Sequence, residues 1–162
     1  MKKIIFLLIS ILLTISIIEF ILYQIKPNYT ELDNILGWNL KKNFQHTYKQ
    51  KNFKGKKYNV NFSTNYLHMR NHFTNTNENN DINFLVFGDS FTSDPYASND
   101  KMWFSKIANL IYEKKGKHAA AYSIGAGGYG SLQQLLSLKK IKKEGFDFNK
   151  INFFIFQFCN ND

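Results

Sequence analysis

The sequence is short of two kinds of residue, and both shortages narrow its chemistry. It holds a single cysteine, Cys159, which excludes an intrachain disulfide and any multi-cysteine metal site. Acidic residues are few, since 12 aspartates and glutamates stand against 21 lysines and arginines, for a net charge of +9. A basic balance is typical of proteins that meet nucleic acid or an anionic membrane surface. No recognised nucleic-acid motif is present and the lysines are spread along the chain, which favours a solvated basic surface and no nucleic-acid partner.

The composition indicates a folded protein, and its distribution divides the chain into three parts. Hydrophobic residues make up 44% and aromatic residues 17% of the 162 residues, which is typical of a globular protein. We predict a membrane anchor over residues 1–26, a polar extension over residues 27–81 and a folded domain over residues 82–162. The extension is rich in asparagine and lysine, so we expect it to be irregular and loosely packed. Within it, residues 58–62 alternate like a short exposed strand.

The N-terminus carries an apolar run over residues 4–25 that follows Lys2 and Lys3. About twenty such residues span a bilayer, and no small-x-small cleavage site follows the run. We therefore predict an uncleaved, single-pass anchor in the cytoplasmic (inner) membrane. The two lysines would keep the N-terminus in the cytoplasm and place the domain on the extracytoplasmic or periplasmic side. A buried helix of a soluble protein is the alternative, and it is disfavoured because the run is apolar all round.

The domain reads as an alternation of short apolar strands and amphipathic helices. Strands are predicted at residues 82–87, 119–124 and 151–158, with helices at residues 102–115 and 131–144 in the gaps. Such an order is typical of an α/β fold with a parallel sheet between helices on both faces. Ligands bind beyond the carboxyl ends of the strands in these folds.

Three polar stretches follow the three predicted strands and would therefore meet at one edge of the sheet. They are Gly-Asp-Ser at residues 88–90, a glycine loop at residues 125–130 and Asn-Asn-Asp at residues 160–162. An exposed serine after a buried strand is a recurring arrangement for a nucleophile, although Gly-Asp-Ser also suits a plain β-turn.

The glycine loop also matches G-x-G-x-x-G, a pattern of dinucleotide sites. The acidic residue that such a site needs is not in place, since Asp147 precedes the next strand and Asp162 is too distant. A tight turn that allows close helix packing explains the same glycines without a ligand.

Taken together, the three stretches resemble the Ser-Gly-Asn-His (SGNH) hydrolases, also called the GDSL type. That family has Gly-Asp-Ser after its first core strand, as at residues 88–90. The block Asn-x-Gly-x-x-Gly-Tyr-Gly-Thr-x-Gln of its membrane-anchored branch is matched by residues 123–133, with Ser123 in place of the asparagine. Its block Gly-x-Asn-Asp is matched by residues 159–162, with Cys159 in place of the glycine.

The resemblance extends to the polar extension and covers residues 33–162. Its other matches are the Leu36-Gly37-Trp38 island and residues 65–70. It implies a three-layer α/β/α, flavodoxin-like SGNH fold with a parallel sheet, incomplete at its C-terminal side. It also implies a catalytic set of Ser90 as nucleophile, with the Ser90 and Gly128 backbone N–H groups and the Asn161 side chain as oxyanion hole. Neither a cofactor nor a metal is implied.

The resemblance lacks one part, the Asp-x-x-His block that supplies the base of the family. The four histidines, none of which lies in such a motif, are His46, His68, His72 and His118. A serine without a base is a weak nucleophile. We therefore expect the chain to be the N-terminal portion of an SGNH protein, to leave its last strand exposed, and to be nearly inactive as it stands.

Three functions are open at this point. The first is a serine ester hydrolase or O-acyl transferase outside the cytoplasmic membrane, acting on an acylated small molecule or glycan. The resemblance suggests acyl esters of cell-envelope polysaccharide as substrate. The second is a degenerate, non-catalytic domain that binds glycan or a partner. The third, a nucleotide-binding protein, is disfavoured by the missing acid.

Overall fold

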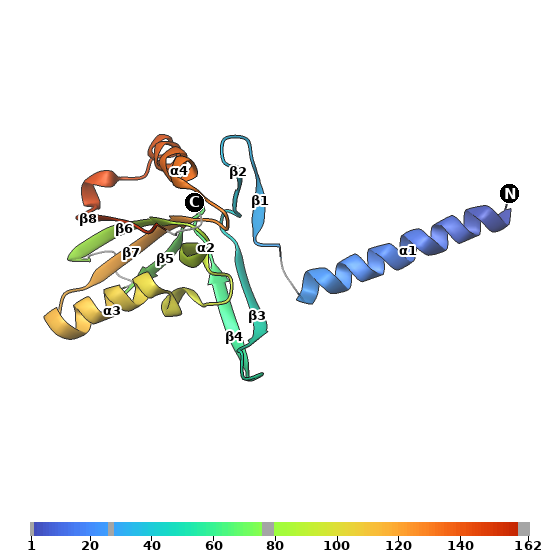
Figure 1. The fold of residues 1–162 in the computed structure, drawn as a ribbon, viewed down its shortest axis with the longest axis horizontal. Coiled ribbons are helices and arrows are strands. Elements are labelled where there is room, and N and C mark those ends of the chain that lie inside the picture. The colour runs from blue at the N-terminus through green and yellow to red at the C-terminus, as the bar shows by residue number, and fades with distance from the viewer. Residues whose placement is uncertain (1, 26–27, 76–79, 159–162) are drawn as a thin grey trace.

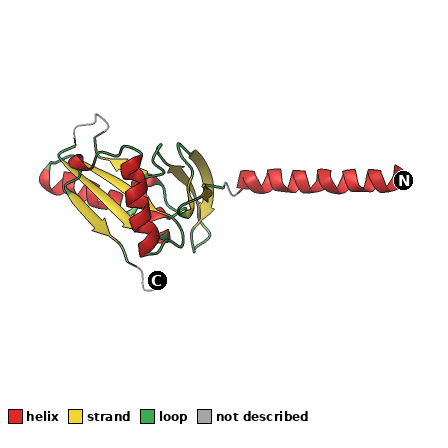
Figure 2. Ribbon diagram, turned by 90° about the horizontal axis from the view of Figure 1, so that it is seen from above, coloured by secondary structure: helices red, strands yellow, loops and turns green. Residues whose placement is uncertain are grey.

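The computed structural model describes residues 2–25, 28–75 and 80–158. Helix α1 (Lys2–Ile25) projects from the folded part as a separate rod (Figures 1 and 2). Its apolar segment Lys3–Leu22 is not buried against the protein and is long and apolar enough to cross a membrane. A signal sequence can have the same length and composition. The structure therefore supports a helix able to span a membrane, and it does not distinguish an anchor from a signal sequence. The retention of the anchor and its orientation stay predictions.

A four-stranded sheet in the order β5-β7-β6-β8 forms the centre of the folded part. Strand β6 (Ile82–Gly88) pairs in parallel with β7 (Ala119–Gly125) on one side and with β8 (Phe153–Phe156) on the other. The three predicted strands are thus parallel, with β6 in the middle. The prediction of an all-parallel sheet is wrong, because β5 (Arg70–Phe73) joins the free edge of β7 in antiparallel orientation.

The central strand is buried because helices cover both faces of the sheet. Alternate side chains of β6 point to opposite faces. Phe84 and Val86 pack in a cluster with α3 (Trp103–Lys115), whereas Leu85 and Phe87 pack in a second cluster that includes Ile141 of α4 (Ser131–Lys143). Figure 1 shows α3 and α4 on opposite sides of the sheet. The protein is therefore a mixed α/β structure with helices on both faces of a mixed sheet.

Strand β8 is the outer strand of the sheet and is open to solvent. Its phenylalanines Phe153, Phe154 and Phe156 are 58%, 48% and 49% exposed. An apolar run of this kind is typical of a buried strand, and that prediction is wrong for β8. The expectation that the last strand is left exposed agrees with the structure. Within the part of the chain that the structure describes, β8 has a strand partner on one side only, so its outer edge is uncovered.

The polar extension is neither irregular nor loosely packed, which corrects the expectation from its composition. It forms one hairpin from β1 (Thr30–Asp33) and β2 (Gly37–Leu40), and another from β3 (Gln45–Lys51) and β4 (Lys57–Ser63). A small core of alternating apolar residues holds the second hairpin to the first; its buried members are Leu40, Tyr48, Val60 and Phe62. Asparagine and lysine occupy the outward positions of these strands, which hid the alternation except at residues 58–62.

Three short helical segments complete the folded part, and each lies in a connection. They are α2 (Ser90–Ser93), η1 (Asn99–Lys101) and η2 (Phe148–Lys150). The first follows β6 directly and therefore starts at the candidate nucleophile.

Candidate active site

Ser90 lies at the carboxyl end of β6 and is the first residue of α2. Asp89 before it is buried, and its carboxylate accepts a hydrogen bond from the Phe91 backbone N–H at 2.9 Å. This cap holds the turn while Ser90 itself stays exposed. The local sequence thus buries the strand, ties down the turn and leaves one hydroxyl at the surface.

Two glycines allow the ends of β6 and β7 to approach each other closely. Gly88 and Gly125 are register partners in the parallel pair. A Cβ placed on Gly88 would lie 2.0 Å from the Thr92 Oγ1, and one placed on Gly125 would lie 2.7 Å from the Gly88 carbonyl oxygen. The clash at Gly125 is with backbone and cannot be relieved by a side-chain movement, so this position requires glycine, whereas a Cβ at Gly88 would displace the Thr92 side chain.

The glycine loop after β7 lies directly beside the serine. A Cβ placed on Gly127 would lie 4.0 Å from the Ser90 Cβ. Gly127 and Gly128 are both exposed, and Gly128 adopts a φ of +78°, a left-handed conformation that favours glycine. Two stretches separated by more than thirty residues in the sequence therefore meet at one edge of the sheet, as the order of the strands predicted.

Trp38 holds the peptide group between Gly127 and Gly128 in place. Its indole Nε1–H donates to the Gly127 carbonyl oxygen at 2.8 Å, and the Tyr129 hydroxyl donates to the Trp38 carbonyl at 2.7 Å. A trans peptide is planar, with its C=O and N–H pointing in opposite directions. The bond from Trp38 to the Gly127 carbonyl thus sets the direction of the Gly128 N–H. The Leu36-Gly37-Trp38 island had no assigned role in the sequence, and this is its contact.

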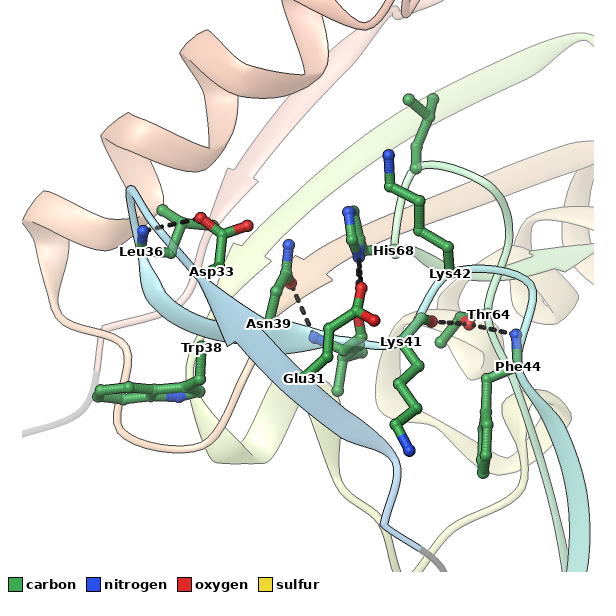
Figure 3. Close-up of polar contacts among 12 residues, drawn as sticks. Glu31, Asp33, Leu36, Trp38, Asn39, Lys41, Lys42, Phe44, Thr64 and His68 are labelled. Carbon is green, nitrogen blue, oxygen red and sulfur yellow. Dashed lines mark hydrogen bonds and ion pairs between the residues drawn. The ribbon is translucent and has the colours of Figure 1, made fainter.

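The hairpin that carries Trp38 is tied to helix α4 by a charged pair. The Asp33 carboxylate accepts from the Lys140 ammonium and from the backbone N–H groups of Ile35 and Leu36 at 2.9 and 3.0 Å. Burial alone would raise the pKa of Asp33, but these donors outweigh it and lower the pKa to about 2. Figure 3 shows Asp33 bonded to the Leu36 N–H at the end of the hairpin. The carboxylate therefore stays charged and keeps the hairpin seated.

His68 lies in the same contact region, where both of its ring nitrogens have polar partners. Its Nδ1 lies 2.5 Å from the Leu40 carbonyl oxygen and 3.4 Å from a Glu31 carboxylate oxygen, as Figure 3 shows for Glu31, and its Nε2 lies 3.4 Å from the Lys140 ammonium. A carbonyl only accepts and an ammonium only donates, so Nδ1 carries the proton and Nε2 is the acceptor. Burial lowers the pKa of His68, which agrees with a neutral ring.

Arg70 organises the loop that follows Ser90. Its guanidinium is fully buried and donates to the backbone carbonyls of Ser93, Asp94 and Ala97 at 2.6–2.8 Å and to the Asn99 Oδ1 at 2.7 and 3.0 Å. Burial lowers the pKa of Arg70 to about 10. The sequence signal for this role is slight: Arg70 is the only arginine in the chain, and it lies in the extension.

Arg70 is also linked to the glycine-loop strand through its backbone. The Ser123 hydroxyl donates to the Arg70 carbonyl at 2.8 Å. Ser123 is the position at which the chain departs from the SGNH block, and it makes a buried supporting hydrogen bond here. A cleft of about 410 Å³ next to α2 is lined by Phe91, Asp94, Lys101, Met102, Trp103 and Gln157.

The predicted catalytic residues are not all placed by the structure. Ser90 and the Gly128 loop come together at the sheet edge, whereas Asn161 and the rest of residues 159–162 lie outside the described residues. The other three histidines have partners of their own: His46 stacks with Tyr48, His72 Nε2 lies 2.8 Å from the Asn109 Oδ1, and His118 stacks with Tyr112. Among the described residues, no histidine contacts Ser90.

A scan against protein-family models, a search of curated proteins and a search of solved structures each found no match to this chain. The assignment of a function therefore depends on the residues and on their geometry.

Proposed function

We propose that the protein is a membrane-anchored serine acyl-ester hydrolase or O-acyl transferase of the SGNH type, with Ser90 as nucleophile. The observation that carries the proposal is the approach of the glycine loop to Ser90, 4.0 Å from a Gly127 Cβ position to the Ser90 Cβ. An exposed serine beside exposed, left-handed glycine backbone is the arrangement that an acyl-transfer site needs.

The proposed reaction has two half-steps. The Ser90 Oγ attacks the acyl carbonyl of the ester while a base accepts the hydroxyl proton, and the carbonyl becomes an oxyanion. The N–H groups of Ser90 and Gly128 and the amide of Asn161 stabilise that oxyanion. Its collapse breaks the bond to the leaving alcohol, which takes up the proton, and leaves an acyl-Ser90 ester. Water or an acceptor hydroxyl then attacks this ester and releases Ser90.

Trp38 supports the first half-step without touching the substrate. A glycine–glycine peptide has a low barrier to flipping because neither residue carries a Cβ. The indole bond to the Gly127 carbonyl stabilises the orientation in which the Gly128 N–H points away from Trp38. Polarisation of the carbonyl by this bond also strengthens the N–H as a donor. Trp38 is therefore a positioning residue in this proposal.

The base is the part that the described residues do not supply. All four histidines are held in contacts away from Ser90, so we expect slow turnover at neutral pH. In serine proteases that lack a catalytic-triad residue, the oxyanion hole and binding alone leave about 10³–10⁴-fold acceleration over water. A soluble base added from outside should then raise the rate further.

The test uses the full chain in detergent with p-nitrophenyl acetate, with and without imidazole as external base. We expect imidazole to accelerate hydrolysis in the wild type and in Ser131→Ala, but not beyond the solution background in Ser90→Ala. Ser131 is a matched control because it is also an exposed serine at the first position of a helix, directly after the glycine loop. Equal rates in Ser90→Ala and wild type would eliminate Ser90 as nucleophile.

A non-catalytic domain that binds glycan or a partner is the second candidate. It is favoured by the absence of a histidine contact to Ser90 among the described residues. In that case acetylated glycan would bind the wild type and Ser90→Ala alike, and mass spectrometry would find no acetyl group on Ser90 after incubation with the activated ester.

A further inference from the structure

The hairpin of β3 and β4 ends in a basic, aromatic tip that the proposed reaction does not use. Five lysines lie on it, at positions 49, 51, 54, 56 and 57, and all five are exposed. The residues from Gln45 to Ser63 include no aspartate or glutamate. Within the described residues, none of these lysines forms an ion pair with an acidic side chain. These five lysines therefore form one exposed basic patch without acidic neighbours on the hairpin.

The tip is a defined turn that pushes an aromatic ring outward. The Asn52 side chain accepts from the backbone N–H groups of Lys54 and Lys56, both at 3.0 Å, and Gly55 takes a φ of +76°. Phe53 lies in this turn and is 94% exposed, and the Lys54 ammonium lies over its ring, 5.7 Å from the centroid. A phenylalanine left in water on an ordered turn gains nothing for the fold.

The lysines are also placed where they repel one another. Lys51 and Lys57 are direct cross-strand partners, and Lys49 lies two residues further along the same face. Like charges directly opposite in a hairpin destabilise it. An anionic surface against the tip would remove that repulsion.

Hydrogen bonds from β4 hold the hairpin to the loop that follows Ser90, so the tip is presented in a fixed direction. The Tyr58 hydroxyl donates to the Tyr96 carbonyl at 3.0 Å and the Asn61 N–H donates to the Ser98 Oγ at 2.9 Å. Figure 1 shows the tip of the hairpin pointing down from the folded part and α1 leaving it to the right, with β8 at the far left.

We propose that the tip of hairpin β3–β4 is a contact surface for an anionic phospholipid bilayer, with the five lysines on the headgroups and Phe53 in the interface. Charge complementarity selects an anionic partner, and the exposed ring selects one with an apolar layer beneath its charge, which duplex nucleic acid and anionic polysaccharide lack. Helix α1 belongs to the same chain and is apolar enough to lie in that bilayer. Once it does, the tethered tip needs only weak affinity of its own.

The experiment places the full chain in lipid nanodiscs and reports on the tip with Phe53→Trp. One set of nanodiscs contains phosphatidylcholine alone, and a second also contains phosphatidylglycerol. Bromine-labelled lipids quench tryptophan that enters the bilayer, and the wild-type signal of Trp38 and Trp103 is subtracted. Phe153→Trp is the matched control, because Phe153 is an exposed phenylalanine of β8 on the opposite side of the folded part.

We expect the tryptophan at position 53 to shift to the blue and to be quenched in the anionic nanodiscs, more than in the neutral ones. Each lysine near an anionic surface contributes about fivefold to binding. Lys51→Gln with Lys57→Gln should therefore lower the ratio of bound to free tip by on the order of tenfold or more. High salt should act in the same direction.

Two results would overturn the proposal. One is quenching at position 53 that equals the quenching at position 153 in the anionic nanodiscs. The other is binding of a DNA duplex or heparin by the lysines while position 53 stays unquenched, which would identify a polyanion as the partner. Circular dichroism of each variant confirms that the hairpin substitutions leave the fold intact.

Discussion

Replacement of Arg70 by methionine should weaken the fold at the loop that follows Ser90. Methionine keeps most of the side-chain volume and the apolar stem but removes every donor. The acceptors that lose their partner are the carbonyls of Ser93, Asp94 and Ala97 and the Asn99 Oδ1. The guanidinium also stacks on the Phe62 ring at 4.2 Å, so the variant loses one cation–π contact as well.

The magnitude follows from the number of acceptors and their burial. A fully buried acceptor left without a donor costs about 1–3 kcal/mol. Several of these acceptors are only partly buried and would regain water, so about 1 kcal/mol each is the appropriate end of that range. The variant also avoids the cost of burying a cation, which is the cost that lowers the Arg70 pKa. We expect a net loss of about 2–4 kcal/mol in the free energy of unfolding.

Chemical denaturation of the full chain in detergent, followed by tryptophan fluorescence, measures this loss. Arg70→Lys keeps the charge but not the planar fork, so it should fall between wild type and Arg70→Met. Lys106→Met, an exposed cation on α3, is the control and should stay within about 0.5 kcal/mol of wild type. An Arg70→Met variant as stable as that control would show that the four acceptors do not depend on the guanidinium.

Two further predictions concern the hairpin of β1 and β2. Trp38→Phe keeps an aromatic ring but loses the hydrogen bond to the Gly127 carbonyl, so the imidazole-assisted rate of ester hydrolysis should fall about tenfold with little change in KM. The control Trp103→Phe should leave that rate unchanged. Because the pKa of Asp33 falls from 3.8 to about 2 on folding, its stabilisation is complete above pH 3.8 and is lost as the pH falls towards 2. In acid denaturation, the free energy of unfolding of the wild type should therefore fall by about 2 kcal/mol over this pH range, and that fall should be absent in Asp33→Asn. The same pH dependence in wild type and Asp33→Asn would contradict the prediction.

The sequence by itself determined the three central strands and their parallel direction. An apolar run as short as that of β6, followed by glycine and a cap, forms a strand and then a turn in any fold that buries it. Two further strands separated by helix-length segments then become parallel, because a chain that crosses over through a helix returns in the same direction. Ser90 and the glycine loop were predicted to share an edge for that reason, and they do.

Only the tertiary structure decided the role of the polar extension. Its residues alternate between asparagine or lysine and single apolar side chains, a pattern that is weak until partner strands supply the other half of the core. Trp38 and Arg70 act on residues far along the chain, and spacing cannot reveal such contacts. The five lysines of the β3–β4 hairpin are already close together in the sequence, within residues 49–57, and what the fold adds is that Lys51 and Lys57 become direct cross-strand partners.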